Sequence, residues 1–255
     1  MVHPWQFQAD PEWAAAIVIV AADYALVVRA LARRGLPTPW WRIAAFTAGL
    51  ALIAVALLSP VEHIALTSLL SVHLLQNVVL ADWAPPLLVL GLSPAMVAAA
   101  ERRRIVRTLT APPVALGYWL AAWYGLHIPV VYGFALTHRW ALGVEHLVFL
   151  TSGIAFWWPV LAGTRMRSAA KVVYLFAAFI AAAPVSLALA LTHPQYSFYV
   201  HAPRLWGLSP LEDQQLGAIA MAIEQAAILF AACSVFFVRM LAEDEAGDAG
   251  VGFEA

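Results

Sequence analysis

Residues 10–35, DPEWAAAIVIVAADYALVVRALARRG, display in one stretch the pattern that the rest of the chain repeats. Asp10 is a favoured N-cap and Pro11 suits the first helical position, so a helix is expected to begin here. About twenty mostly apolar residues follow, the length that a helix needs to cross a hydrocarbon core of about 30 Å. Arg33 and Arg34 close the apolar run. The stretch therefore predicts a membrane-spanning helix with a basic end.

The composition of the whole chain fits a protein whose solvent is lipid. Of its 255 residues, 63% are hydrophobic and 11% are charged, whereas soluble domains average about 45–50% and about 25%. The 14 basic and 15 acidic residues give a net charge of −1 and no footprint for nucleic acid. The single cysteine, Cys233, excludes an intramolecular disulfide and a CxxC redox pair.

Apolar segments of similar length recur along the chain. The expected spans cover about residues 12–31, 40–59, 62–92, 113–127, 139–161, 169–191 and 213–240. Pro85 and Pro86 should kink or interrupt the third span, because a proline cannot donate the backbone hydrogen bond of a helix. Six or eight spans are the alternatives, the larger number if this break separates two half-spans.

The expected fold class is therefore all-α: a polytopic membrane bundle of about seven transmembrane helices. Residues 1–241 should form a single transmembrane domain. Residues 242–255 are acidic and rich in glycine, with too little apolar surface to offset the entropy of ordering them. They are expected to form a disordered tail.

The basic residues predict the orientation in the membrane. Twelve of the 14 fall in connections or span ends on one side. They are Arg29, Arg33, Arg34, Arg42, Arg102, Arg103, Arg104, Arg107, Arg165, Arg167, Lys171 and Arg239. Only Arg139 and Arg204 fall on the other side. Because basic loops stay in the cytoplasm, the N-terminus is expected outside and the C-terminus in the cytoplasm.

The histidines gather on the opposite, outer side. With this topology, outer loops or outer span ends hold His3, His63, His127, His138, His193 and His201. His73 and His146 lie inside the third and fifth spans, both roughly 10–17 Å below the outer surface at the rise of a helix. Ionisable groups in lipid usually face the interior of a bundle, so these two are the first candidates for function.

Polar side chains form stripes on three spans. They are His73, Gln76 and Asn77 on the third, His138, Glu145 and His146 on the fifth, and Asp213, Met221 and Glu224 on the last. One interpretation is a metal site, since imidazole and thioether groups suit Cu(I) and carboxylates can support them. The other is that these groups only hydrogen-bond neighbouring helices. No HxxxH pair occurs on any one span to favour the metal.

Three segments together resemble the CtaG family of bacterial cytochrome c oxidase assembly factors. They are SVHLLQNVVLADWAPPLLVLGLSP from residue 71, HIPVVYGFALTHRWALGVEHLVFLTSGIAFWWPVL from residue 127 and GLSPLEDQQLGAIAMAIEQ from residue 207. They occur in the family's order, and the resemblance covers about residues 60–240. It implies a seven-helix protein of the bacterial inner membrane that acts with oxidase subunits during maturation of a haem-copper oxidase, with copper supply as its usual proposed role.

Individual positions carry over from this family. His73 and Gln76 match the first histidine and the glutamine of its HxxQH element, while Asn77 stands where the second histidine is usual. Asp213 matches the first residue of a DQ pair, and Met221 matches the methionine that follows it.

The HxxEH element of the family is also incomplete. Glu145 and His146 match its end, but Leu142 replaces its first histidine. The resemblance thus implies a sparse copper site. Its candidate ligands are His73, His146 and Met221, with Glu145, Asp213 and Gln76 as supporting polar residues.

Three functions stay open. The first is an assembly factor that delivers or inserts copper on the outer side of the membrane. The second, favoured by Asn77 and Leu142, is a structural subunit of a respiratory oxidase complex that has lost its metal site. The third is a transporter, which is disfavoured because the intramembrane acids form no continuous path inward. No nucleophile stands beside a base at motif spacing, and no glycine-rich phosphate loop occurs, so the sequence indicates no enzyme.

Overall fold

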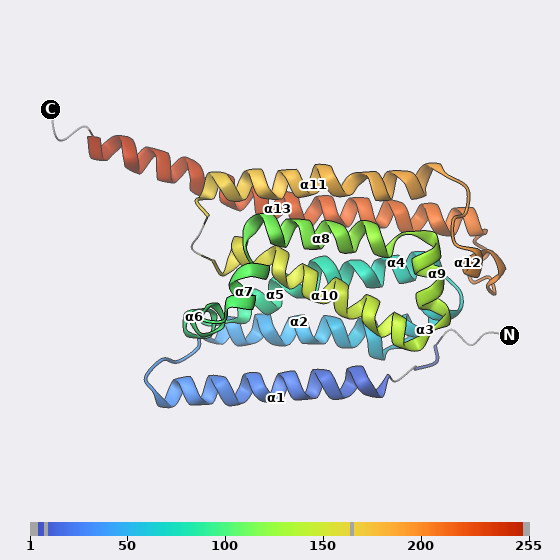
Figure 1. Ribbon diagram of the computed structural model, residues 1–255, viewed down its shortest axis with the longest axis horizontal. Coiled ribbons are helices and arrows are strands. Elements are labelled where there is room, and N and C mark those ends of the chain that lie inside the picture. The colour runs from blue at the N-terminus through green and yellow to red at the C-terminus, as the bar shows by residue number, and fades with distance from the viewer. Residues whose placement is uncertain (1–4, 8–9, 164–165, 252–255) are drawn as a thin grey trace.

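The computed structural model describes residues 5–7, 10–163 and 166–251, and all regular structure within them is helical. Six helices are long and apolar enough to cross a membrane, and a seventh span results if the bent pair α8–α9 counts as one. The long helices lie side by side along the long axis of the molecule (Figure 1). The prediction of an all-α, polytopic membrane bundle is confirmed.

The expected spans agree with the helices to within a few residues, apart from the end of the last, where the helix runs on from residue 240 to Val251, and apart from the third. The long helices outside it are α1 (Pro11–Arg33), α2 (Trp40–Leu58), α8 (Pro112–Leu126), α10 (Arg139–Leu161), α11 (Ser168–Leu191) and α13 (Pro210–Val251). Short helices connect them: α3 (Pro60–Thr67), α6 (Pro94–Glu101), α7 (Arg104–Leu109), α9 (Pro129–Thr137) and α12 (Ser197–His201).

The predicted start of the third span, near residue 62, is wrong. Glu62 belongs to the separate helix α3, and the span begins only with α4 (Leu70–Val78). Ser68 and Leu69 lie between them in non-helical conformations. The leucine cannot cap the helix that follows, so the first N–H groups of α4 are bound by a carboxylate from α13, which the sequence around the break does not reveal.

The third span is not interrupted by its two prolines. The π-helix η1 (Val79–Trp83) and the helix α5 (Ala84–Gly91) continue α4 into a single apolar run of 22 residues. Pro85 and Pro86 occupy the first turn of α5, directly after the wider π turn. Because π segments and prolines both bend helices without ending them, no pair of half-spans forms here.

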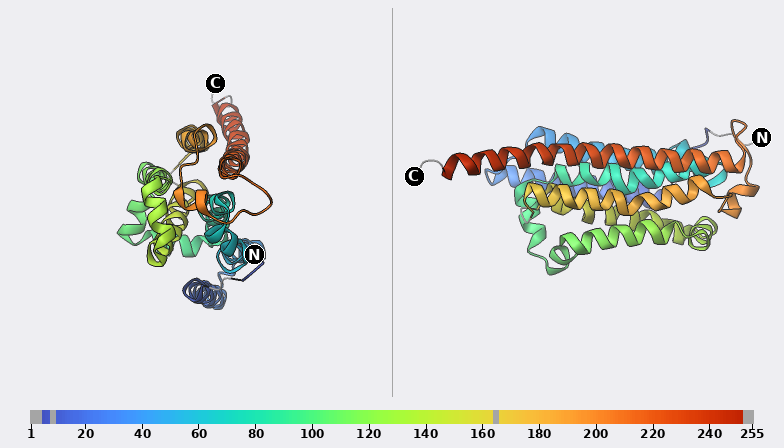
Figure 2. Two further views of the ribbon diagram at one scale, coloured as in Figure 1. Left: turned by 90° about the vertical axis from the view of Figure 1, so that its right-hand side faces the viewer. Right: turned by 90° about the horizontal axis from the view of Figure 1, so that it is seen from above.

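The third span and α10 form the centre of the bundle. Gly153 of α10 lies so close to η1 that an added Cβ would come within 2.1 Å of the carbonyl oxygen of Ala81. By contrast, α1 contributes no buried residue and lies at the edge of the bundle when the molecule is viewed along its helices (Figure 2). The polar side chains of the third span and α10 are therefore enclosed by other helices.

The two ends of the bundle differ in chemistry. The helices α3, α9 and α12 lie at one end, and α6 and α7 lie at the other (Figure 1). The second end holds most of the basic residues predicted to face the cytoplasm, although Arg165 lies outside the described residues. The first end is called the histidine end below. Its predicted extracytoplasmic position stays a prediction.

The helix α13 continues to Val251, past the predicted domain boundary at residue 241. It projects beyond the other helices at the end opposite the histidines (Figure 2). Residues 252–255 lie outside the described residues. The division into a bundle domain and an acidic tail stays a prediction.

Candidate functional site

Three buried histidines from different elements meet at the histidine end. His73 comes from the first turns of α4, His146 from the second turn of α10, and His127 from the C-terminal end of α8. The ring centres of His73 and His146 are 6.1 Å apart. Tyr132 of α9 lies between two of them, 5.0 Å from the ring of His73 and 6.3 Å from that of His127. The histidines predicted in the third and fifth spans thus share one cluster.

A hydrogen-bond chain fixes the tautomer of His73. The Tyr199 hydroxyl donates its proton to the carbonyl oxygen of Ala65 at 2.6 Å. It must therefore accept from Nδ1–H of His73, which lies 2.8 Å away. Burial raises the pKa of Tyr199 well above its usual value, so the hydroxyl stays protonated. His73 is left with a lone pair on Nε2, which is the form of imidazole that binds a metal.

His127 is in the same state. Its Nδ1–H donates to the carbonyl oxygen of Trp123 at 2.6 Å, so its Nε2 also carries the lone pair. The Nε2 atoms of His73, His127 and His146 are buried, and none has a hydrogen-bond partner in the described structure. The cluster therefore presents buried imidazole nitrogens that no group of the described residues binds.

The sequence interpretation placed His127 at an outer span end and did not include it in the site. Its side chain is only 6% exposed. The chain turns by 76° between α8 and α9, which carries His127 and Tyr132 under the end of the bundle. Pro129 at the first position of α9 was the available signal, because a proline there starts a new helix in a new direction.

A carboxylate faces the imidazoles. Oε1 of Glu145 lies 3.8 Å from Nε2 of His73 and accepts a hydrogen bond from the side-chain amide of Asn77 at 3.2 Å. Its second oxygen, Oε2, is buried without a partner in the described structure. Asn77 thus orients Glu145. A supporting role of Glu145 at a metal site stays a prediction.

Gln76 belongs to a neighbouring network. Its amide donates to the carbonyl oxygen of Ala56 at 2.8 Å and to the carboxylate of Glu62. Glu62 is 3% exposed. Burial raises the pKa of Glu62 to about 7, although the hydrogen bond from Gln76 acts in the opposite direction. Gln76 therefore supports a second buried acid rather than the imidazoles.

Asp213 stabilises the start of α4. Its carboxylate accepts hydrogen bonds from the backbone N–H of Leu70 at 2.8 Å, and from the N–H and hydroxyl of Ser71 at 3.0 and 2.6 Å. A carboxylate at this position caps α4 and interacts favourably with its dipole. Asp213 thus fixes the helix turn that bears His73 without facing the imidazoles.

Met221 is fully buried on α13. One turn earlier, Gly217 packs on Ser71 and Leu74, which lie on the face of α4 turned away from His73. Among the described residues, no three His, Cys, Asp or Glu side chains lie close enough together to hold a metal ion. Of the predicted ligands, His73 and His146 lie close together, with ring centres 6.1 Å apart. A thioether ligand from Met221 stays a prediction.

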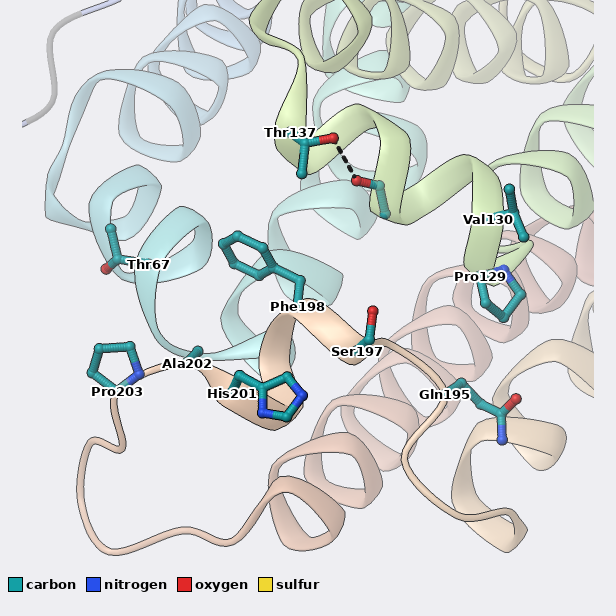
Figure 3. A pocket seen from close by; sticks show the side chains of 11 residues that line it. Thr67, Pro129, Val130, Thr137, Gln195, Ser197, Phe198, His201, Ala202 and Pro203 are labelled. Atoms are coloured by element: carbon teal, nitrogen blue, oxygen red, sulfur yellow. Dashed lines mark hydrogen bonds between the residues drawn. The ribbon is translucent and has the colours of Figure 1, made fainter.

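An open bowl of about 750 Å³ lies at the histidine end of the bundle (Figure 3). Thr137 lies on one side of it and Thr67 on another, while Phe198 and His201 of α12 line it. Tyr199 on the same short helix is 2% exposed and reaches inward to His73. The helix α12 thus separates the bowl from the imidazoles. His3, another predicted outer histidine, lies outside the described residues.

Fold and site together define a multi-pass membrane protein with a buried imidazole and carboxylate cluster near one end of the bundle. The family model of the cytochrome c oxidase caa3 assembly factor (Caa3_CtaG) matches residues 22–243, and the chain belongs to this family. The recognition made from the three sequence segments is confirmed. No curated protein and no solved structure matches the chain.

Proposed function

We propose that this assembly factor assists copper delivery or insertion into a haem-copper cytochrome c oxidase, on the outer side of the bacterial inner membrane. The observation that carries the proposal is the buried pair of His73 and His146, each with a bare Nε2. Imidazole nitrogens suit copper. Ring centres 6.1 Å apart leave room for one ion at about 2 Å from a nitrogen of each ring.

Each residue has a role in this proposal. His73 and His146 bind the ion. A soft third ligand from Met221 of α13 would require its side chain to reach round from the face of α4 turned away from His73. Glu145, whose Oε1 lies 3.8 Å from Nε2 of His73, balances the charge of the ion. A site with so few ligands holds its ion weakly, which suits a protein that passes the ion to a partner. The oxidase subunits are the proposed partner, and no catalytic step by this chain is required.

Copper loading of the purified protein tests this role. The wild-type protein and a variant with His73→Ala and His146→Ala are incubated with Cu(I) under ascorbate, and bound copper is measured after desalting. The matched control carries His193→Ala and His201→Ala, which remove two exposed histidines. We expect binding in the wild type and the control and little in the site variant. Equal, negligible binding in all three proteins would exclude the copper role.

The second candidate function is a structural subunit of the oxidase complex. It is favoured by Asn77, whose amide is engaged with Glu145, and by the apolar Leu142 at a position where the family has an imidazole. Extraction in a gentle detergent separates the two functions. A subunit co-purifies with haem-bearing partners in stoichiometric amount, whereas an assembly factor is present in less than stoichiometric amount.

A further inference from the structure

A second cavity lies at the histidine end, and its lining includes the buried Glu62 and Leu142. It has a volume of about 330 Å³ and lies between α3, α9 and the start of α10. Its polar lining includes Asp10, Glu62 and Arg139, and its wall includes Leu142. This cavity is called the acidic port below. It shares Thr67 and Thr137 with the bowl of Figure 3, so the two hollows adjoin.

An ion pair lies in the lining of the acidic port. Arg139 lies 3.4 Å from the carboxylate of Asp10, and its side chain is 65% exposed. Asp10 itself is 17% exposed and caps α1. An ion pair this open to solvent contributes little stability, typically below about 1 kcal/mol. The guanidinium can therefore move aside at low cost.

The inner part of the port holds the buried acid. Glu62 is bound to Gln76, and the Oε1 atom of Gln76 is itself buried without a partner in the described structure. Gln76 lies one turn after His73 on α4, so a path from Glu62 through this amide leads to the part of α4 that carries His73. The port thus continues inward through acceptor oxygens rather than through apolar side chains alone.

Leu142 lies at the boundary between the port and the imidazole site. It lies three and four residues before Glu145 and His146 on α10, so all three share one face of the helix. Its side chain therefore separates the cavity from the two polar groups behind it.

The geometry points to a cation entry port: Glu62 draws a cation through the opening guarded by Asp10 and Arg139, and Gln76 passes it on toward the imidazoles, past the side chain of Leu142. Two carboxylates against one guanidinium favour positive over negative ions in this narrow space. The identity of the cation as Cu(I) rests on the proposed function. The cation preference of the port is independent of that function, because it follows from the lining residues.

Thiol labelling tests the port without copper. Leu142→Cys is made in a Cys233→Ser background, and the labelling rates of a cationic and an anionic methanethiosulfonate of similar size are compared. The matched control is Ser197→Cys, an exposed position in the bowl away from the acids. We expect the cationic reagent to be favoured several-fold more at position 142 than at position 197. Adding Glu62→Gln should bring the two ratios together.

Two results would overturn the port. One is a Leu142→Cys protein whose new thiol reacts with neither reagent. The other is a cationic preference in that protein equal to the preference of the Ser197→Cys control. If Glu62→Gln does not fold, Asp10→Asn tests the same charge at the mouth. Failure of copper loading with a normal labelling preference would reject the copper function and retain the port.

Discussion

At the scale of single residues, the state of His73 is decided by a neighbour far along the sequence. Tyr199 can accept from Nδ1 only because it donates its own proton to Ala65. This leaves Nε2 free, and it holds the ring in one orientation. Partners of this kind set the tautomer and the basicity of metal-binding histidines.

Replacing Tyr199 with Phe should therefore weaken Cu(I) binding by roughly tenfold to a hundredfold, the usual effect of losing the partner of a ligating histidine. Competition with a chromogenic Cu(I) chelator measures the affinity. Tyr118→Phe is the control, because its hydroxyl bonds to Thr151 instead. An unchanged affinity in a folded Tyr199→Phe protein would show that His73 does not act as proposed.

Replacing Leu142 with His should strengthen Cu(I) binding by roughly tenfold or more, because it places a second imidazole one helical turn before His146. The same competition experiment measures the change. Leu136→His, also in the lining of the port but on α9, serves as the control. If the Leu142→His protein binds Cu(I) no more tightly than the control, position 142 does not lie beside the imidazole site.

Glu62 makes the port sensitive to pH. Its pKa is raised to about 7, chiefly by burial. The charged or titratable groups that face it are Asp10, Arg139, Glu145 and Tyr199. Since the carboxylate is charged only above its pKa, the cationic labelling preference at position 142 should rise as the pH increases through about 7. A preference that is flat from about pH 6 to about pH 8 would exclude Glu62 as its source.

At the scale of elements, the break between α3 and α4 is the feature on which the site depends. It places Glu62 in the port and begins a new helix whose first turns carry His73. Asp213 of α13 holds that helix start by three hydrogen bonds. The last span is thus attached to the third at the level of the imidazoles.

Asp213→Ala should destabilise the protein by about 2 kcal/mol or more, since it leaves buried donors without partners. Asp213→Asn should recover part of the loss, because its amide oxygen can still accept. Thermal unfolding in detergent measures the effect, with Glu212→Gln as the exposed neighbouring control. An Asp213→Ala protein as stable as the wild type would show that the cap is unimportant.

At the scale of the whole molecule, the bundle could be predicted from the sequence because lipid demands long apolar helices. The helix Arg139–Leu161 was predicted with its observed bounds for this reason. The start of α4 could not be predicted from the sequence, since it is fixed by Asp213, which lies 143 residues after Leu70. His127 was missed because its inward position depends on the bend between α8 and α9, which apolar periodicity does not encode.

The central claim is that the imidazole pair supplies copper to the oxidase, and the ratio of copper to haem in that oxidase tests it most directly. The oxidase is purified from cells whose only copy of this protein carries His73→Ala and His146→Ala, and from cells with the wild-type protein. We predict a normal haem content with a several-fold loss of copper in the variant cells. A ratio of copper to haem equal to that of the wild type would contradict the account.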